Sequence, residues 1–162
     1  MEVLTFPNKK LFQRCEEVTV FGPELLVLLE AMHNTMVSAN GIGLAANQVG
    51  LDYKMFVMRS EDDKQKFFLV NPTILKRSDA LANRKEGCLS APGEFITLSD
   101  RRKWVLVTFQ DPAGKIRRHV FEDLLAVCVQ HEMDHLDGHS FLQSKSIPRA
   151  KRKELAKKWK LP

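Results

Sequence analysis

The chain has 162 residues, of which 44% are hydrophobic, and both values are ordinary for a single globular domain spanning residues 1–162. No run reaches the ~18 apolar residues of a membrane span, and no secretory signal opens the sequence, so we expect no membrane association and a cytoplasmic location. The net charge of +5 is concentrated in residues 145–160, where eight basic residues accompany Glu154 alone. Three cysteines, an odd number, favour reduced thiols over a disulfide framework.

A first helix is predicted to begin at Gly22-Pro23-Glu24, because proline and an acidic residue are both favoured in a first helical turn. Apolar residues then recur at helical spacing to about residue 38, which predicts a face packed on the core. His33 on this helix is expected at the surface or boundary of the fold, not as a ligand. Residues 40–50 follow, with three glycines and two alanines, and predict a tight connection whose backbone N–H groups can approach a ligand closely.

The spacing of apolar residues then changes from 3.6 to 2, which predicts short strands. The expected strands are residues 53–59, 66–70, 73–77, 104–110 and 115–121, the last two forming a hairpin around the turn at residues 111–114. A helix over residues 122–137 follows, and a final helix is expected to start near Ser146-Ile147-Pro148 with serine as its cap. This order predicts an α+β fold in which antiparallel sheets wrap one central buried helix.

The predicted central helix ends in Gln-His-Glu-Met-Asp-His-Leu-Asp-Gly at residues 130–138. Two histidines four residues apart, His131 and His135, share one face of a helix and can bind one metal ion. Glu132 is placed to take a proton from a water molecule on that ion. The motif is short, however, and chance matches occur in helices that bind nothing. A catalytic site usually has three protein ligands, so a third must come from elsewhere.

Cys88 is a candidate for the third ligand. It lies in Glu86-Gly-Cys-Leu-Ser-Ala-Pro-Gly93, and a cysteine beside glycine in a loop is better placed to reach a metal than to pack in a core. Because 43 residues separate Cys88 from His131, spacing alone leaves this pairing a hypothesis. Cys128, inside the apolar helix, is expected to serve core packing.

Three motifs therefore stand in order, at residues 41–48 (Gly-Ile-Gly-Leu-Ala-Ala-Asn-Gln), 86–90 (Glu-Gly-Cys-Leu-Ser) and 130–138. Together they resemble the signature motifs of peptide deformylases, and the resemblance reaches from residue 4 to about residue 144. It implies removal of the formyl group from the N-terminal formyl-methionine of nascent chains, with release of formate. It also implies a bacterial or phage source, or an organelle enzyme that has lost its transit peptide.

The resemblance assigns a role to each of several residues. It implies one divalent metal ion, Fe(II) first, with Zn(II), Ni(II) or Co(II) as substitutes, held by Cys88, His131 and His135. It makes Glu132 the general base and then the acid, and it places the side chain of Gln48 and the backbone N–H of Leu89 around the oxyanion. Gly43 would offer its backbone to the formyl group. The substrate pocket that it implies comprises Ile42, Gly43, Glu86, Leu124, Val127 and Cys128.

The sequence departs from the family pattern at two places. Arg84 stands where an apolar residue is common near the pocket. Asp100 occupies the position of an expected basic residue and Arg101-Arg102 follow it, so we assign no arginine to the substrate. Two other functions remain open on the sequence alone: a zinc endopeptidase, suggested by the two histidines and glutamate, and a basic RNA-binding domain with a structural metal.

Residues 145–162 predict a basic C-terminal helix, with Ala150, Leu155 and Trp159 against the body and lysines outward. Such a helix is either simply solvated or a contact to ribosomal RNA, where salt-sensitive binding to phosphates is expected. The resemblance favours contact with the ribosome through this helix. It also implies that the substrates are nascent formyl-methionyl peptides. The chain is expected to act as a monomer.

Overall fold

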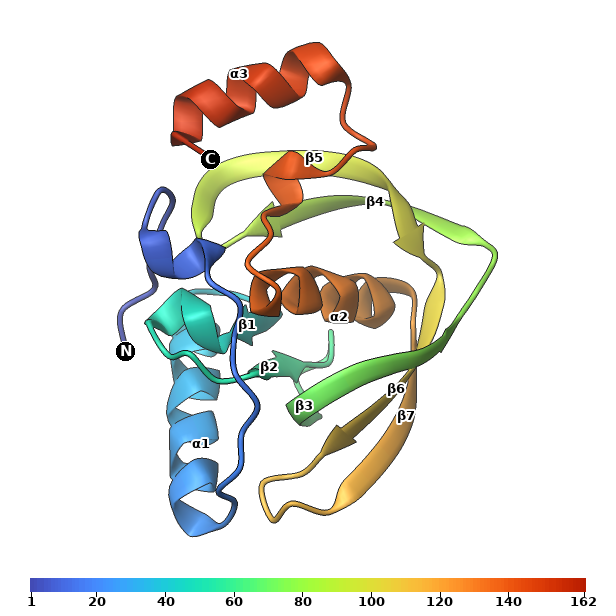
Figure 1. Cartoon of the computed structure of the whole chain (residues 1–162). Helices are drawn as coiled ribbons and strands as arrows, with labels where there is room; N and C mark the ends of the chain where they lie inside the picture. Colours follow the sequence, from blue (N-terminus) through green and yellow to red (C-terminus); the bar gives the residue numbers. More distant parts are fainter.

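The computed structural model describes all residues from 1 to 162 and has an α+β architecture (Figure 1). Its helices are α1 Pro23–Ser38, α2 Asp123–Leu136 and α3 Arg149–Trp159, with 3-10 turns at Lys9–Phe12, Ala46–Val49 and Phe141–Gln143. Its strands are β1 Gly43–Ala45, β2 Met55–Arg59, β3 Lys66–Arg77, β4 Leu81–Cys88, β5 Ala91–Arg102, β6 Trp104–Gln110 and β7 Ile116–Glu122. No helix has the length and apolar character needed to cross a bilayer.

The strands form two antiparallel sheets, one with the order β1-β2-β3-β6-β7 and one that is the β4–β5 hairpin. Helix α2 lies between them, with the hairpin on one side and the larger sheet on the other (Figure 1). Its apolar side chains and those of the larger sheet form one core cluster, which contains Phe56, Leu69, Phe121 and Val129. The expected central buried helix within antiparallel sheets is confirmed.

Helix α1 covers the opposite side of β1 and β2, where its leucines and methionines form a second core cluster. Its predicted bounds are confirmed, but the expectation for His33 is wrong, because this side chain is only 6% exposed. The ring packs edge-on against Phe68 of β3, with centroids 6.1 Å apart. His33 follows Leu29 by four residues and precedes Met36 by three, so all three lie on the same face of the helix, and that face is buried.

The strand predictions were accurate for the hairpin around residues 111–114 and incomplete elsewhere. Strands β6 and β7 match the predicted hairpin, but residues 66–70 and 73–77 form one strand, β3. Asn71 adopts a left-handed φ of 50°, and its side chain bonds the backbone N–H and C=O of Val18, so the strand continues past Pro72 through a bulge. Strands β4 and β5 were not predicted, because polar side chains interrupt the alternation on their exposed face.

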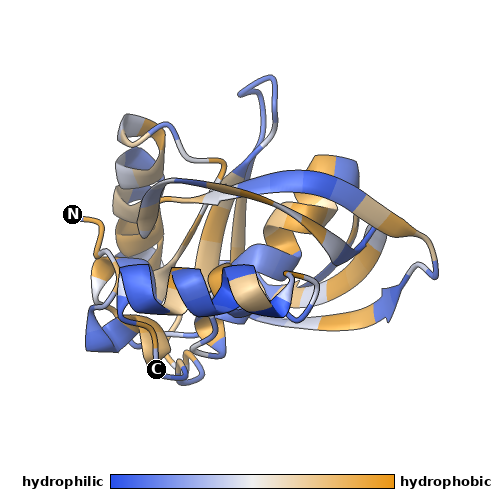
Figure 2. Cartoon of the chain, turned by 90° about the horizontal axis from the view of Figure 1, so that it is seen from above, coloured by the Kyte–Doolittle hydropathy of each residue, from blue (hydrophilic) through white to orange (hydrophobic).

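Helix α3 lies along the outside of the β5 strand, and Figure 2 shows its largely hydrophilic surface turned toward the viewer. Leu155 is buried and Trp159 packs on the third core cluster, as predicted, whereas Ala150 is exposed. The N-cap is Pro148, and no side chain caps the helix, so the expected serine cap is wrong.

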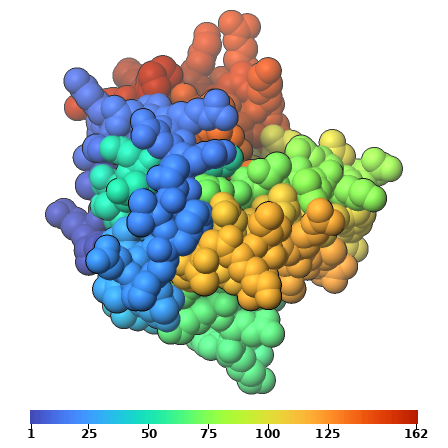
Figure 3. Space-filling model, turned by 60° about the horizontal axis from the view of Figure 1, so that its bottom comes forward, coloured from blue at the N-terminus to red at the C-terminus, as the bar shows by residue number.

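Figure 3 shows the loop between β2 and β3, residues 60–65, projecting from the end of the molecule opposite to α3.

Candidate active site

A cavity of about 460 Å³ opens between β1, the end of the β4–β5 hairpin and α2. Eleven of the twelve residues singled out in the sequence line it, namely Ile42, Gly43, Gln48, Glu86, Cys88, Leu89, Leu124, Val127, Cys128, His131 and Glu132. His135 lies beneath it, 1% exposed. Three segments far apart in the sequence therefore converge on one space, which spacing along the chain could not establish.

Cys88, His131 and His135 bring one donor atom each to the same point, and these atoms lie within 4.8 Å of one another. Cys88 ends β4, where the chain turns sharply into β5, and its Sγ is 3.2 Å from His135 Nε2. The two histidine rings are 5.0 Å apart between centroids and meet edge to face. One thiolate and two imidazoles are a donor set that suits zinc or iron, and three protein donors leave a coordination position free.

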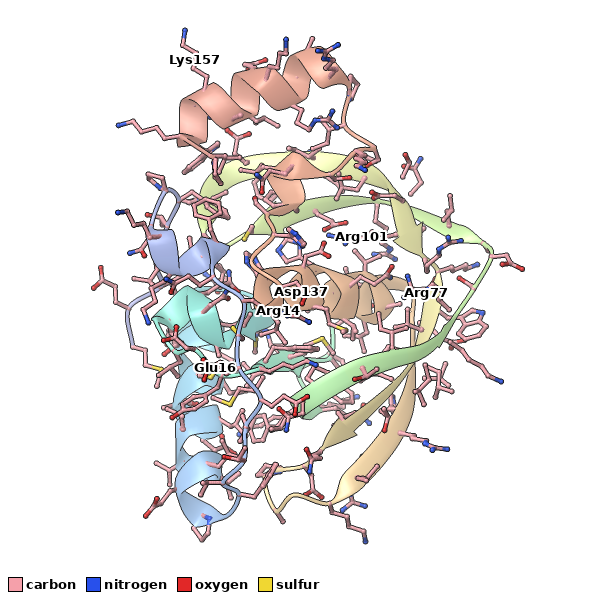
Figure 4. All side chains as sticks on the ribbon, in the orientation of Figure 1. Arg14, Glu16, Arg77, Arg101, Asp137 and Lys157 are labelled. Carbon is pink, nitrogen blue, oxygen red and sulfur yellow. The ribbon has the colours of Figure 1, made fainter.

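The orientation of His131 is held by an acid–base network that the sequence did not reveal. Glu86 Oε2 lies 2.9 Å from His131 Nδ1, which leaves the other ring nitrogen for a metal. Arg101 donates to both oxygens of Glu86, at 2.8 and 3.1 Å, and donates to Asp134 Oδ2 at 2.6 Å. Figure 4 labels Arg101 between α2 and the hairpin. Burial disfavours ionisation of Glu86, but the hydrogen bonds from His131 and Arg101 hold its pKa below the ordinary value.

Glu132 lies at the inner end of the cavity and is 4% exposed. Its Oε2 is buried without a hydrogen-bond partner, and burial raises the pKa of the carboxyl to about 7. Strand β1 passes directly above it at Gly43. A Cβ at that position would lie 2.5 Å from Glu132 Oε1 and 2.6 Å from Cys128 Sγ, so only glycine allows the strand this close to the helix.

Gln48 is 1% exposed and is fixed by three contacts. Its Oε1 accepts the backbone N–H of Ala45 at 2.8 Å, and its Nε2 donates to Ser90 Oγ at 3.0 Å and to Cys88 Sγ at 3.6 Å. Its amide group is therefore held beside the thiol end of the candidate metal site. The N–H of Leu89 is adjacent in the chain to Cys88, and the Leu89 side chain packs toward α1 and fixes this turn.

The cavity wall also contains residues that the sequence gave no reason to select. Lys85 and Phe95, on β4 and β5, stand at the rim, whereas Arg84 does not line the cavity. Arg102, the other arginine considered, donates to the carbonyls of Ser78 and Asp79 at the far end of the hairpin. Knowledge of the β4–β5 register would have been needed to find Lys85 and Phe95.

Comparison with known proteins agrees with this geometry. A family model described as polypeptide deformylase matches residues 1–152. A peptide deformylase of Campylobacter jejuni is 36% identical over 165 residues, covering 98% of this chain and 93% of the relative. A crystal structure of a peptide deformylase from Synechococcus elongatus in complex with actinonin has a TM-score of 0.88 at 35% identity, covering 99% of this chain and 86% of that chain. The chain therefore belongs to the polypeptide deformylase family.

Proposed function

We propose that this peptide deformylase removes the formyl group from newly made polypeptides that begin with formyl-methionine, releasing formate. The observation that supports this most directly is the convergence of Cys88, His131 and His135 with Glu132 on one cavity. Cys88 comes from an upstream strand, whereas zinc endopeptidases with the same helix motif usually take a third histidine or glutamate. A structural metal site would have no use for a buried glutamate beside it.

Cys88, His131 and His135 are the proposed ligands of one divalent ion. Fe(II) is the first candidate by family, and Zn(II), Ni(II) or Co(II) fit the same donors. When bound, such an ion lowers the pKa of water toward about 7 and polarises a carbonyl oxygen. Glu86 is proposed to orient His131, since both of its carboxylate oxygens are already engaged by protein groups.

Glu132 is the proposed general base and acid. A carboxyl whose pKa is about 7 can accept a proton from water at neutral pH and return it to the departing amine. The unpartnered Oε2 is the atom available for this transfer. Gly43 is proposed to bring its backbone to the formyl end of the substrate, because no side chain stands between β1 and Glu132.

The amide of Gln48 and the N–H of Leu89 are proposed to stabilise the oxyanion of the tetrahedral intermediate. One well-placed donor contributes about 2.7–4 kcal/mol to such a step. Both donors are held rigidly, Gln48 through Ala45 and Ser90 and Leu89 through the turn at Cys88. The methionine side chain would occupy the apolar part of the cavity, which is formed by Ile42, Leu124, Val127 and Cys128.

The test is release of formate from formyl-Met-Ala-Ser by the Fe(II)-loaded protein and by a Glu132→Gln variant. Loss of the general base is expected to lower kcat by about 10²–10⁴-fold, while the three ligands retain the metal. Metal content per chain, measured on both proteins, checks the second expectation. A fully active variant would remove Glu132 from the mechanism, and cleavage of internal peptide bonds without formate would favour an endopeptidase.

We also propose that the protein acts as a monomer in the cytoplasm and contacts the ribosome through α3. The exposed lysines of α3 and of its C-cap include Lys153, Lys157 and Lys160, and Figure 4 shows Lys157 directed away from the body. Deleting α3 would remove Leu155 and Trp159 from the core, so charge changes are the cleaner test. The triple variant Lys153→Gln/Lys157→Gln/Lys160→Gln should co-sediment less with ribosomes and with a smaller salt slope.

The matched control changes three exposed lysines outside α3, Lys64, Lys76 and Lys115, to glutamine. It lowers the total charge by the same amount and should retain most ribosome binding. Equal loss in both triple variants would mean that α3 has no special part in the interaction.

A further inference from the structure

The rim of the active-site cavity is formed on one side by the face of the β4–β5 hairpin that carries Lys85 and Phe95. In the antiparallel register Gly87 is paired with Phe95 and Lys85 with Thr97. Residues two apart on a strand share a face, so Lys85 and Phe95 are diagonal neighbours on the same side. Both line the cavity, and neither has a part in the proposed chemistry.

Phe95 is a large aromatic residue that is 63% exposed. It lies across the strand from Gly87, where an added Cβ would be 2.7 Å from Phe95 Cε1. The absence of a side chain at position 87 therefore lets the ring rest on the neighbouring strand. The ammonium of Lys85 lies 5.7 Å from the ring centroid, within the range of a cation–π contact.

The charge of Lys85 has no balancing carboxylate. Lys85 makes no ion pair, and the other charged groups along the cavity wall are already engaged or lie at its inner end. Glu86 is held by Arg101 and His131, and Glu132 is at the floor. Glu94, next to Phe95, is bound from the outside by Lys158 and Trp159 of α3. The rim thus combines an exposed aromatic ring with a free positive charge.

We propose that Lys85 and Phe95 form a subsite for the residues that follow formyl-methionine and that this subsite favours an acidic side chain. The inference rests on the proposed function, because it requires the methionine side chain in the apolar part of the cavity and the peptide leaving across the rim. The ring supports the aliphatic part of the incoming side chain, and the ammonium attracts its carboxylate. Lys85 is a specificity-determining residue in this scheme, with no part in the bond cleavage.

The test compares peptide amides formyl-Met-Xaa-Ser and formyl-Met-Ser-Xaa, with glutamate, glutamine or lysine at Xaa. At low ionic strength the wild-type protein should turn over the glutamate peptide with a kcat/KM about fivefold above that of the lysine peptide, at one of the two positions. The difference should lie in KM and shrink at high salt, since the contact is exposed. Lys85→Met should bring the ratio close to one, and Lys85→Glu should invert it.

Arg84→Met is the matched control, because Arg84 is an exposed basic neighbour on β4 that does not line the cavity. This variant should retain the wild-type ratio. Phe95→Ser should raise KM for all three peptides while the preference for glutamate persists. Equal kcat/KM for glutamate and lysine peptides in the wild type, or a preference that survives Lys85→Met, overturns the proposal. Absence of formate from the glutamine peptides would instead overturn the proposed function itself.

Discussion

Each of the two longest helices buries a histidine to almost the same extent, yet the two rings have opposite surroundings. His131 of α2 is 7% exposed, and His33 of α1 is 6% exposed. His131 Nδ1 faces the carboxylate of Glu86, whereas neither ring nitrogen of His33 has a hydrogen-bond partner. His33 simply fills space beside Phe68. Burial alone therefore does not distinguish a candidate metal ligand from a histidine that packs.

The distinction lies in what surrounds the ring. From His131 a chain of charged groups runs through Glu86 and the buried Arg101 to Asp134, whose side chain is 40% exposed at the surface. Buried charges are tolerated only when each is paired, and here every member has a partner. Such a network maintains one orientation of the imidazole, as a metal site requires. No comparable chain reaches His33, so changes at the two positions should have different consequences.

The largest effect is expected from Arg101→Met, which breaks the network at its centre. Glu86 would then remain buried with His131 as its only ionic partner, and the free energy of unfolding should fall by about 3–5 kcal/mol. The affinity for the metal should fall by about 10–100-fold, because His131 loses its fixed orientation. Urea denaturation and competition with a chelator measure the two quantities.

Asp134→Asn tests the same network of charged groups with a smaller expected loss of stability. It removes the partly exposed end of the network but leaves the bidentate contact between Arg101 and Glu86 intact. The expected loss of stability is about 1 kcal/mol or less, with metal affinity close to that of the wild type. If Asp134→Asn weakened metal binding as much as Arg101→Met, the orientation of His131 would depend on the surface carboxylate and not on Glu86.

The parts of the molecule that the sequence predicted well are those determined locally. The 3.6-residue spacing of α1 and α2, the turn at residues 111–114 and the two histidines four residues apart all act within a few residues of chain. His131, His135 and Glu132 could therefore be named before the fold was known, and Cys88 could be suggested as the third ligand from its place beside glycine. The resemblance to a family supported that pairing and added the roles of Gln48 and Leu89, whose proximity to the helix depends on long-range packing.

The parts that were missed depend on the register between distant strands. Arg101 stands in a segment that looks polar, and only the β4–β5 pairing places it beside Glu86. Lys85 and Phe95 reach the cavity rim for the same reason. A buried arginine usually has an acidic partner, so knowing that Arg101 is buried would have prompted a search for Glu86. The sequence alone does not show that Arg101 is buried.

The smallest effect is expected at His33, and it concerns pH. Burial, followed by the nearby charge of Lys66, lowers the pKa of His33 below its ordinary value, so the unfolded chain binds a proton more readily than the folded one. The contribution that neutral His33 makes to the free energy of unfolding is then fully present above about pH 6.5. It decreases as the pH falls, by at most about 1.4 kcal/mol per pH unit. In His33→Leu this decrease disappears, so the free energy of unfolding should change less between pH 7.5 and 5.5 than in the wild type. If His33→Leu kept the pH dependence of the wild type, the folded protein would have to accept a proton on His33 as readily as the unfolded chain, and the ring would not be the packing group that its surroundings indicate.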